Sequence, residues 1–399
     1  SGDSGGGVAY IGGNFLGQGS EKNAQSTAVA AGSVINADAI SRGNGGKVAV
    51  WSDQTTQFNG SISARGGAIS GNGGEVETSG KLLNINSSAS VNTAAPKGVA
   101  GNWLLDPDDI TIGNVSLWGS NYGINVDTRV LTNALNSGNV TIKTTSSAAN
   151  CGNLPCSGSS SGNGDIVILD TIGEVADGSN GIPLQWIRGD STLTLSAYRD
   201  IRFKATDNVS LPGYFDSTIG GAIAVSSGGR VVLKADNTGT GSGTVRFDRA
   251  DYNNILFFDS AGGVDIYYNP DSYDTPTNYA PYVQTLMSGQ LKTYMAVNIN
   301  ANVADKTYDG TNAATIVGGV TSKSGLPSGI SLQTGSANAT FVDQNAGSNK
   351  ALIISGVTFN GGNTIVNYSG QNYYINGLDS KTATINKANL VLELSLIHI

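Results

Sequence analysis

The sequence predicts an all-β protein: a right-handed parallel β-helix followed by a small immunoglobulin-like β-sandwich. Three observations predict this fold. A Gly-rich motif recurs after 28 residues, short stretches of alternating apolar and polar residues follow one another, and the pattern changes near Val297. Gly supplies 56 of the 399 residues and charged residues only 13 %, a composition typical of neither helix bundles nor disordered chains.

The clearest repeat is residues 43–48 (GNGGKV), which recur as residues 71–76 (GNGGEV). In a parallel β-helix, successive coils stack about 4.8 Å apart through ladder hydrogen bonds. Apolar side chains then point inward, and Gly or Asn takes corners with positive φ. The sequence therefore predicts equivalent corners at Gly46 and Gly74 and core positions at Val48, Val76, Phe58 and Ile85.

Further strand-like stretches extend the repeat in both directions. Upstream, Val34 matches Ile62 in the 28-residue register. Downstream, Val140, Ile166 and Leu193 follow one another at 26 and 27 residues, which predicts one coil each. An antiparallel sandwich would instead show turn signals every 8–12 residues.

An acidic turn interrupts the repeat at residues 101–112 (GNWLLDPDDITI). Asp-Pro-Asp-Asp between two apolar strings is typical of a turn, and the simplest interpretation is a change in the course of the solenoid. The alternative is a weak ligand or cation site formed by Asp106, Asp108 and Asp109.

Two other segments depart from the strand pattern. Residues 128–136 are amphipathic and precede Ser137-Gly138, which predicts one short helix that caps or crosses a coil. Residues 267–297 are rich in Tyr and Pro, and we expect the solenoid to end there. Tyrosines would cover the open end of the core, because an open coil is an unpaired strand edge. Stacking of these tyrosines on sugars is the alternative.

Histidine and cysteine counts restrict the chemistry. The one histidine, His398, leaves no Ser-His-Asp triad, Cys-His dyad or His-ligated metal site in this sequence. We therefore expect no catalytic residues, no metal and no cofactor. Cys151 and Cys156 lie close together in a Ser/Gly-rich stretch and are candidates for a local disulfide, with two unpaired thiols as the alternative.

Charge and hydropathy exclude two classes of partner. The net charge of −8 gives no basic footprint for nucleic acid. No run of 18 apolar residues occurs, so no transmembrane segment is predicted.

Three segments near the N-terminus resemble filamentous-haemagglutinin-type exoproteins, the large adhesins that Gram-negative bacteria export by two-partner secretion. These are residues 46–53 (GKVAVWSD), 60–67 (GSISARGG) and 73–80 (GGEVETSG). Residues 103–112 resemble the segment that follows this β-helix in high-molecular-weight adhesins.

The second half carries another resemblance. Residues 306–311 (KTYDGT), 339–341 (ATF), Val357 and 367–368 resemble the YDG module, a stalk repeat of such surface proteins. Together the resemblances imply four parts: haemagglutinin-type coils over 1–100, continued β-helix over 101–295, a YDG-type sandwich over 298–388, and a next module or an unrelated tail over 389–399.

The resemblance implies a non-enzymatic shaft or stalk of an adhesin, secreted or held at the outer membrane, that attaches cells to surfaces. Its expected partners are a host-cell or surface receptor, for which a glycan is one form, and an outer-membrane secretion partner that would act on an N-terminal part missing from this sequence. Two alternatives remain: a polysaccharide-active β-helix enzyme, and the stalk of a contact-dependent toxin delivery protein.

Overall fold

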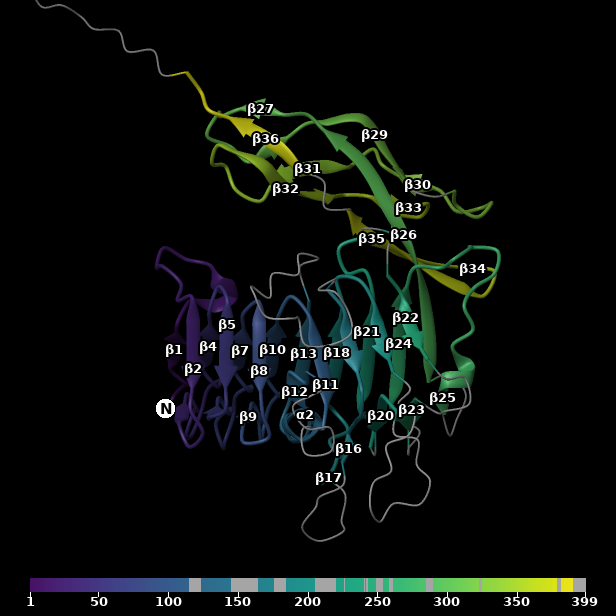
Figure 1. Ribbon diagram of the computed structural model, residues 1–399. Coiled ribbons are helices and arrows are strands. Elements are labelled where there is room, and N and C mark those ends of the chain that lie inside the picture. Colours follow the sequence, from purple (N-terminus) through teal and green to yellow (C-terminus); the bar gives the residue numbers. More distant parts are fainter. Residues whose placement is uncertain are drawn as a thin grey trace, which may run out of the picture. The chain divides into compact units, whose positions relative to one another are not determined.

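The computed structural model divides the chain into two compact units, which we describe separately (Figure 1). The first comprises residues 1–237, 243–269 and 277–294, and the second comprises residues 238–242, 270–276 and 295–399. The structure describes residues 1–114, 123–144, 164–175, 184–204, 220–225, 227–239, 241, 243–248, 254–257, 261–284, 290–322, 325–378 and 382–389.

A long parallel sheet runs through the first unit, and its strands lie side by side in chain order from purple to green (Figure 1). Each strand pairs in register with the strand one coil later; Val48, for example, lies opposite Val76. The strands are β1 (Val8–Ile11), β4 (Lys47–Trp51), β7 (Glu75–Ser79), β10 (Asn102–Asp106), β13 (Asn139–Lys143), β18 (Thr192–Ser196), β21 (Arg230–Lys234) and β24 (Gly263–Tyr268).

Two further parallel sheets repeat with the same coils. Phe58 pairs with Ile85 in the second sheet. In spatial order the second sheet contains β2 (Ser26–Val29), β5 (Thr55–Phe58), β8 (Leu82–Ile85), β12 (Val126–Asp127), β11 (Ile110–Gly113), β14 (Ile166–Ile168), β19 (Ile201–Phe203) and β22 (Val245–Phe247). The third contains β3 (Val34–Asn36), β6 (Ser61–Ser63) and β9 (Ser90–Asn92).

Smaller sheets complete the first unit. A four-stranded parallel sheet contains β15 (Thr171–Ile172), β20 (Ala222–Val225), β23 (Ile255–Phe257) and β25 (Val283–Gln284), and β16 (Glu174–Val175) pairs antiparallel with β17 (Leu184–Gln185). Short helical turns are η1 (Phe15–Gly17) and η3 (Ala280–Tyr282).

The core consists of columns of side chains that run from coil to coil. One column has exposed fractions of 0–1 % and contains Val48, Val76, Trp103, Val140, Leu193, Val231 and Val264. Phe58 and Ile85 are equally buried, so all four predicted core positions are placed as expected. The all-β prediction is confirmed, and this coil-on-coil parallel pairing is the pattern of a parallel β-helix. The right-handed winding stays a prediction.

Two sequence-based registers were wrong. Ile62 pairs with Ile35 rather than Val34, so the alignment was shifted by one residue. Val140 pairs directly with Leu193, whereas Ile166 lies in the second sheet between Ile110 and Ile201. The 26- and 27-residue spacings therefore joined strands of different sheets, because residues added at a corner lengthen a coil without changing its ladder.

The reason for glycine at the repeated motif also differs from the prediction. Positive φ occurs at Gly43 and Gly71, at 92° and 123°, and not at Gly46 or Gly74. Gly46 and Gly74 do lie at equivalent positions, but there glycine allows close stacking: a Cβ on Gly74 would come 2.1 Å from the carbonyl oxygen of Gly46.

The predicted helix is present as α2 (Thr128–Leu135). The carboxylate of Asp127 caps its N-terminus by accepting the backbone N–H of Arg129, and it also forms an ion pair with the Arg129 side chain. The helix buries Val130, Leu131 and Leu135, so it extends the core of the coils that it crosses.

Aromatic side chains cover the last strand of the second sheet, as predicted for the Tyr-rich segment. Phe247 on β22 stacks between Phe203 and Tyr282, with ring centroids 4.5 Å apart in both pairs. Tyr279 is 2 % exposed and donates a hydrogen bond from its hydroxyl to the Val245 carbonyl oxygen at 3.1 Å. These rings close an edge that would otherwise expose the core.

The second unit is a sandwich of mainly antiparallel strands. Ile299 and Val320 of one layer pack with Leu332 and Ile354 of the other, and a second cluster centres on Phe341. One layer contains β29 (Ile316–Ser322), β26 (Leu291–Val303), β35 (Gln371–Leu378) and β34 (Ile365–Tyr368). The other contains β27 (Lys306–Thr307), β36 (Thr382–Asn386), β32 (Gly347–Ser355), β31 (Asn338–Phe341) and β28 (Ala313–Ala314), with β30 (Leu332–Gln333) paired to β33 (Thr358–Phe359). The immunoglobulin-like strand order stays a prediction.

Candidate functional site

The three aspartates of the acidic turn separate into two environments. Asp106 ends β10 and Asp108 follows it, and both line a surface cleft. Asp109 instead accepts two hydrogen bonds at Oδ1, from the backbone N–H groups of Gly164 at 2.8 Å and Asp165 at 2.9 Å. Asp109 therefore joins two coils, whereas Asp106 and Asp108 are the members of the turn that a ligand could reach.

The cleft, which we call the corner cleft, has a volume of about 430 Å³ and lies where the first sheet turns into the second. Consecutive coils each contribute their corner residues to it, so residues far apart in the sequence share one surface. Its lining comprises Gln25, Trp51, Ser52, Asp53, Gln54, Gly80, Lys81, Asp106 and Asp108.

Trp51 is held rigidly at the corner cleft. Its indole Nε1 donates a hydrogen bond to Asp53 Oδ1 at 3.1 Å, and the same oxygen accepts a second bond from Asn23 Nδ2 at 2.9 Å. Gly13 and Gly17 pack against the ring so closely that a Cβ on Gly17 would come 2.4 Å from Trp51 Cζ2. The ring is therefore fixed before any ligand arrives.

The carboxyl group of Asp108 is unusual in its electrostatics. Burial is the main cause that raises its pKa to about 6; the charges of Asp109 and Asp106 act in the same direction, and Lys81 acts against it. A carboxyl group with a raised pKa in a cleft is a frequent property of functional sites.

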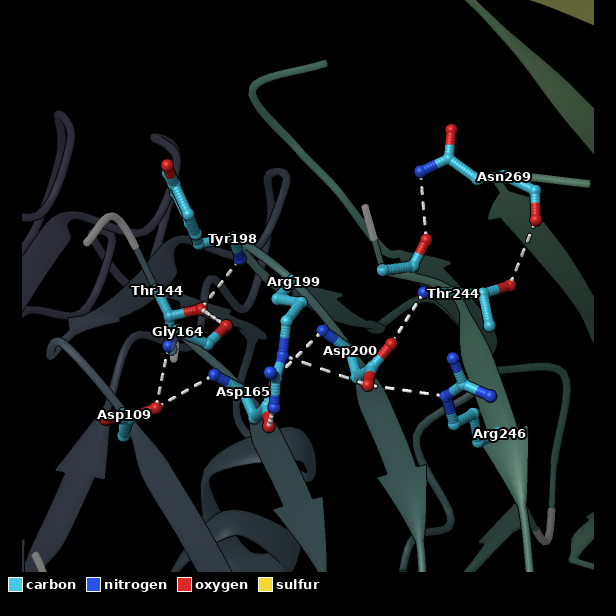
Figure 2. Close-up of polar contacts among 11 residues, drawn as sticks. Asp109, Thr144, Gly164, Asp165, Tyr198, Arg199, Asp200, Thr244, Arg246 and Asn269 are labelled. Atoms are coloured by element: carbon cyan, nitrogen blue, oxygen red, sulfur yellow. Dashed lines mark hydrogen bonds and ion pairs between the residues drawn. The ribbon is translucent and has the colours of Figure 1, made fainter. Parts of the chain in front are cut away.

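A ladder of aspartates, which sequence reasoning missed, joins the coils beside this region (Figure 2). Asp165 accepts the backbone N–H of Asp200 at 3.0 Å, and Asp200 accepts that of Thr244 at 2.8 Å. Arg199 forms an ion pair with Asp165, whose side chain is fully buried. The aspartate ladder thus satisfies backbone donors where each strand of the second sheet begins.

A sequence signal for this ladder exists. The strands begin DITI at Asp109, DIVI at Asp165 and DIRF at Asp200, and the last one, TVRF, has Thr244 in place of aspartate. Thr244 precedes β22, the last strand of the second sheet, so no further strand there presents an N–H to an aspartate. The spacings between these tetrapeptides are irregular, which is why a search for a fixed period passes over them.

The YDG turn, residues 308–310, is organised by Asp309 in the second unit. Its Oδ1 accepts Lys306 Nζ at 2.7 Å and the backbone N–H of Thr311 at 2.9 Å. Lys306 is the main cause that lowers the pKa of Asp309 to about 2. Gly310 has φ of 79°, which requires glycine, and Tyr308 is 42 % exposed, so the turn presents a tyrosine ring to solvent.

Other predicted or expected sites are as follows. Cys151 and Cys156 lie outside the described residues. Within the described ranges, no group of three or more His, Cys, Asp or Glu residues is placed to hold a metal ion. In the same part of the chain, no helix has the length and apolar character needed to cross a bilayer.

Together these features define an all-β protein with a stacked parallel-strand unit and a sandwich unit. Residues 292–384 match the YDG domain family, so this part of the chain is a YDG domain. The predicted YDG module is thereby confirmed. A comparison with curated proteins finds no match to the chain.

Proposed function

We propose that this chain is a shaft or stalk segment of a surface-exposed or secreted adhesin of the filamentous-haemagglutinin type, exported by two-partner secretion. The observation that carries the proposal is the coil-on-coil stack from β1 to β24, followed in the sequence by a YDG domain. Stacked repeats extend a protein in one direction, and each coil needs only its neighbours for stability.

The side chains outside the stack suit a hydrated surface. On β13 and β18 the core residues alternate with Asn139 and Thr141 and with Thr192 and Thr194, which are partly exposed. Such a surface stays soluble without high charge, and it leaves room for a receptor site on the shaft or beyond it.

Surface digestion and adherence test the proposal in the bacterium that encodes the chain. We expect protease added to intact cells to remove the chain, and deletion of the coding region to reduce adherence to host cells or surfaces. A protease-protected chain, together with unchanged adherence of the deletion strain, would overturn the proposal.

A second candidate, a polysaccharide-active enzyme, has one specific observation in its favour. Asp53, Asp106 and Asp108 come from different coils yet line the corner cleft, and the pKa of Asp108 is raised to about 6. A glycosidase needs two such carboxyl groups, one as acid and one as base or nucleophile. Release of reducing ends from polysaccharides, abolished by Asp108→Asn, would favour this candidate over the adhesin.

A further inference from the structure

We propose that the corner cleft binds one ring of an uncharged saccharide on the shaft itself. The inference rests on the proposed adhesive function, because it names the ligand class of that function. Its test uses purified protein without cells, so it can fail independently. The volume of about 430 Å³ lies in the range of small-molecule sites.

Backbone hydrogen bonds between coils fix the positions of the lining residues. Gln54 N–H donates to the Gln25 carbonyl oxygen at 3.1 Å, Leu82 N–H donates to that of Gln54 at 2.8 Å, and Asp108 N–H donates to that of Lys81 at 3.1 Å. The stacked ladder therefore presents four consecutive corners as one preformed surface, which lowers the entropic cost of binding.

Trp51 supplies the apolar part of the site. A sugar ring has faces of C–H groups that can pack on an aromatic ring, and a tryptophan side chain offers the largest such surface. Asp53 and the two packed glycines fix the Trp51 ring, so little side-chain freedom is lost on binding.

The polar lining matches hydroxyl groups, which both donate and accept hydrogen bonds. The amides of Gln25 and Gln54 offer donors and acceptors, Lys81 offers donors, and the carboxylates of Asp106 and Asp108 offer acceptors. Three carboxylates, with Asp53, against one lysine make the cleft negative. Negative potential disfavours sialylated or sulfated sugars, which leaves an uncharged saccharide as the matching ligand.

Titration of the full chain with N-acetylglucosamine, galactose, mannose and their oligosaccharides tests the proposal, with saturation-transfer NMR as the readout. We expect saturable binding of at least one of these sugars. Gln54→Ala and Trp51→Phe should each weaken it at least tenfold. Gln57→Ala is the matched control, because Gln57 is an exposed glutamine on the same coil that does not line the cleft, and it should leave binding unchanged.

Several outcomes would overturn the proposal: no binding of any uncharged saccharide, binding that survives both Gln54→Ala and Trp51→Phe, or binding of sialyllactose or choline alone. Adherence of cells without saccharide binding by the purified chain would overturn this inference and leave the proposed function standing. Saccharide binding without any role in adherence would support the cleft and contradict the adhesin.

Discussion

A single carboxyl group, that of Asp108, shows how the cleft trades stability for charge. Because burial raises its pKa in the folded chain to about 6 from 3.8, the unfolded chain ionises first as the pH rises. Folding is therefore unpenalised below pH 3.8 and loses free energy as the pH rises to about 6, after which the loss is constant.

Asp108→Asn should remove this penalty. We expect the variant to gain about 1 kcal/mol in free energy of unfolding at pH 7.5, a value reduced for solvent screening, and nothing at pH 3.5. Urea unfolding at both pH values measures the difference. An equal gain at the two pH values would show that the charge is not the cause.

Asp165 carries a larger structural burden than its exposed counterparts. Asp165→Ala removes the acceptor for Arg199 and for the backbone N–H of Asp200, which leaves buried donors unpaired. We expect a loss of about 3 kcal/mol in guanidinium unfolding. Asp190→Ala is the control: this exposed partner of Arg188 should cost less than about 0.5 kcal/mol, and equal losses would contradict the role assigned to the ladder.

Stacking between coils depends on glycines at the scale of the strand. An added Cβ at Gly74 would meet the Gly46 carbonyl oxygen at 2.1 Å, whereas one at Gly7 meets no atom within 4 Å. We expect Gly74→Ala to lose about 2 kcal/mol and Gly7→Ala to stay within about 0.5 kcal/mol, measured by thermal unfolding. Similar stabilities would mean that the coils separate at little cost.

The elements also show what sequence alone could predict. The repeated residues 43–48 and 71–76 have equal coil lengths, so the pattern located their strands and the core positions Val48 and Val76. Val140 and Leu193 are partners across 53 residues, and no periodic search finds such a pair. The corner cleft was not predicted at all, because Trp51 and Asp108 become neighbours of one cleft only when the coils stack.

At the scale of the whole chain, the two units have separate cores. The first is built from columns such as Val48 and Val76, and the second from clusters such as that of Phe341, Ala383 and Ile385. Units with their own cores can unfold in separate transitions, which a single free energy of unfolding does not describe.

Differential scanning calorimetry of the full chain should therefore resolve two transitions. Phe341→Ala removes a fully buried ring from the second unit and should cost about 3–5 kcal/mol there, which lowers only one melting temperature. Asp165→Ala acts within the first unit and should lower only the other. A single transition that both variants shift by the same amount would show one cooperative unit, and the YDG domain would then depend on the coils for its stability.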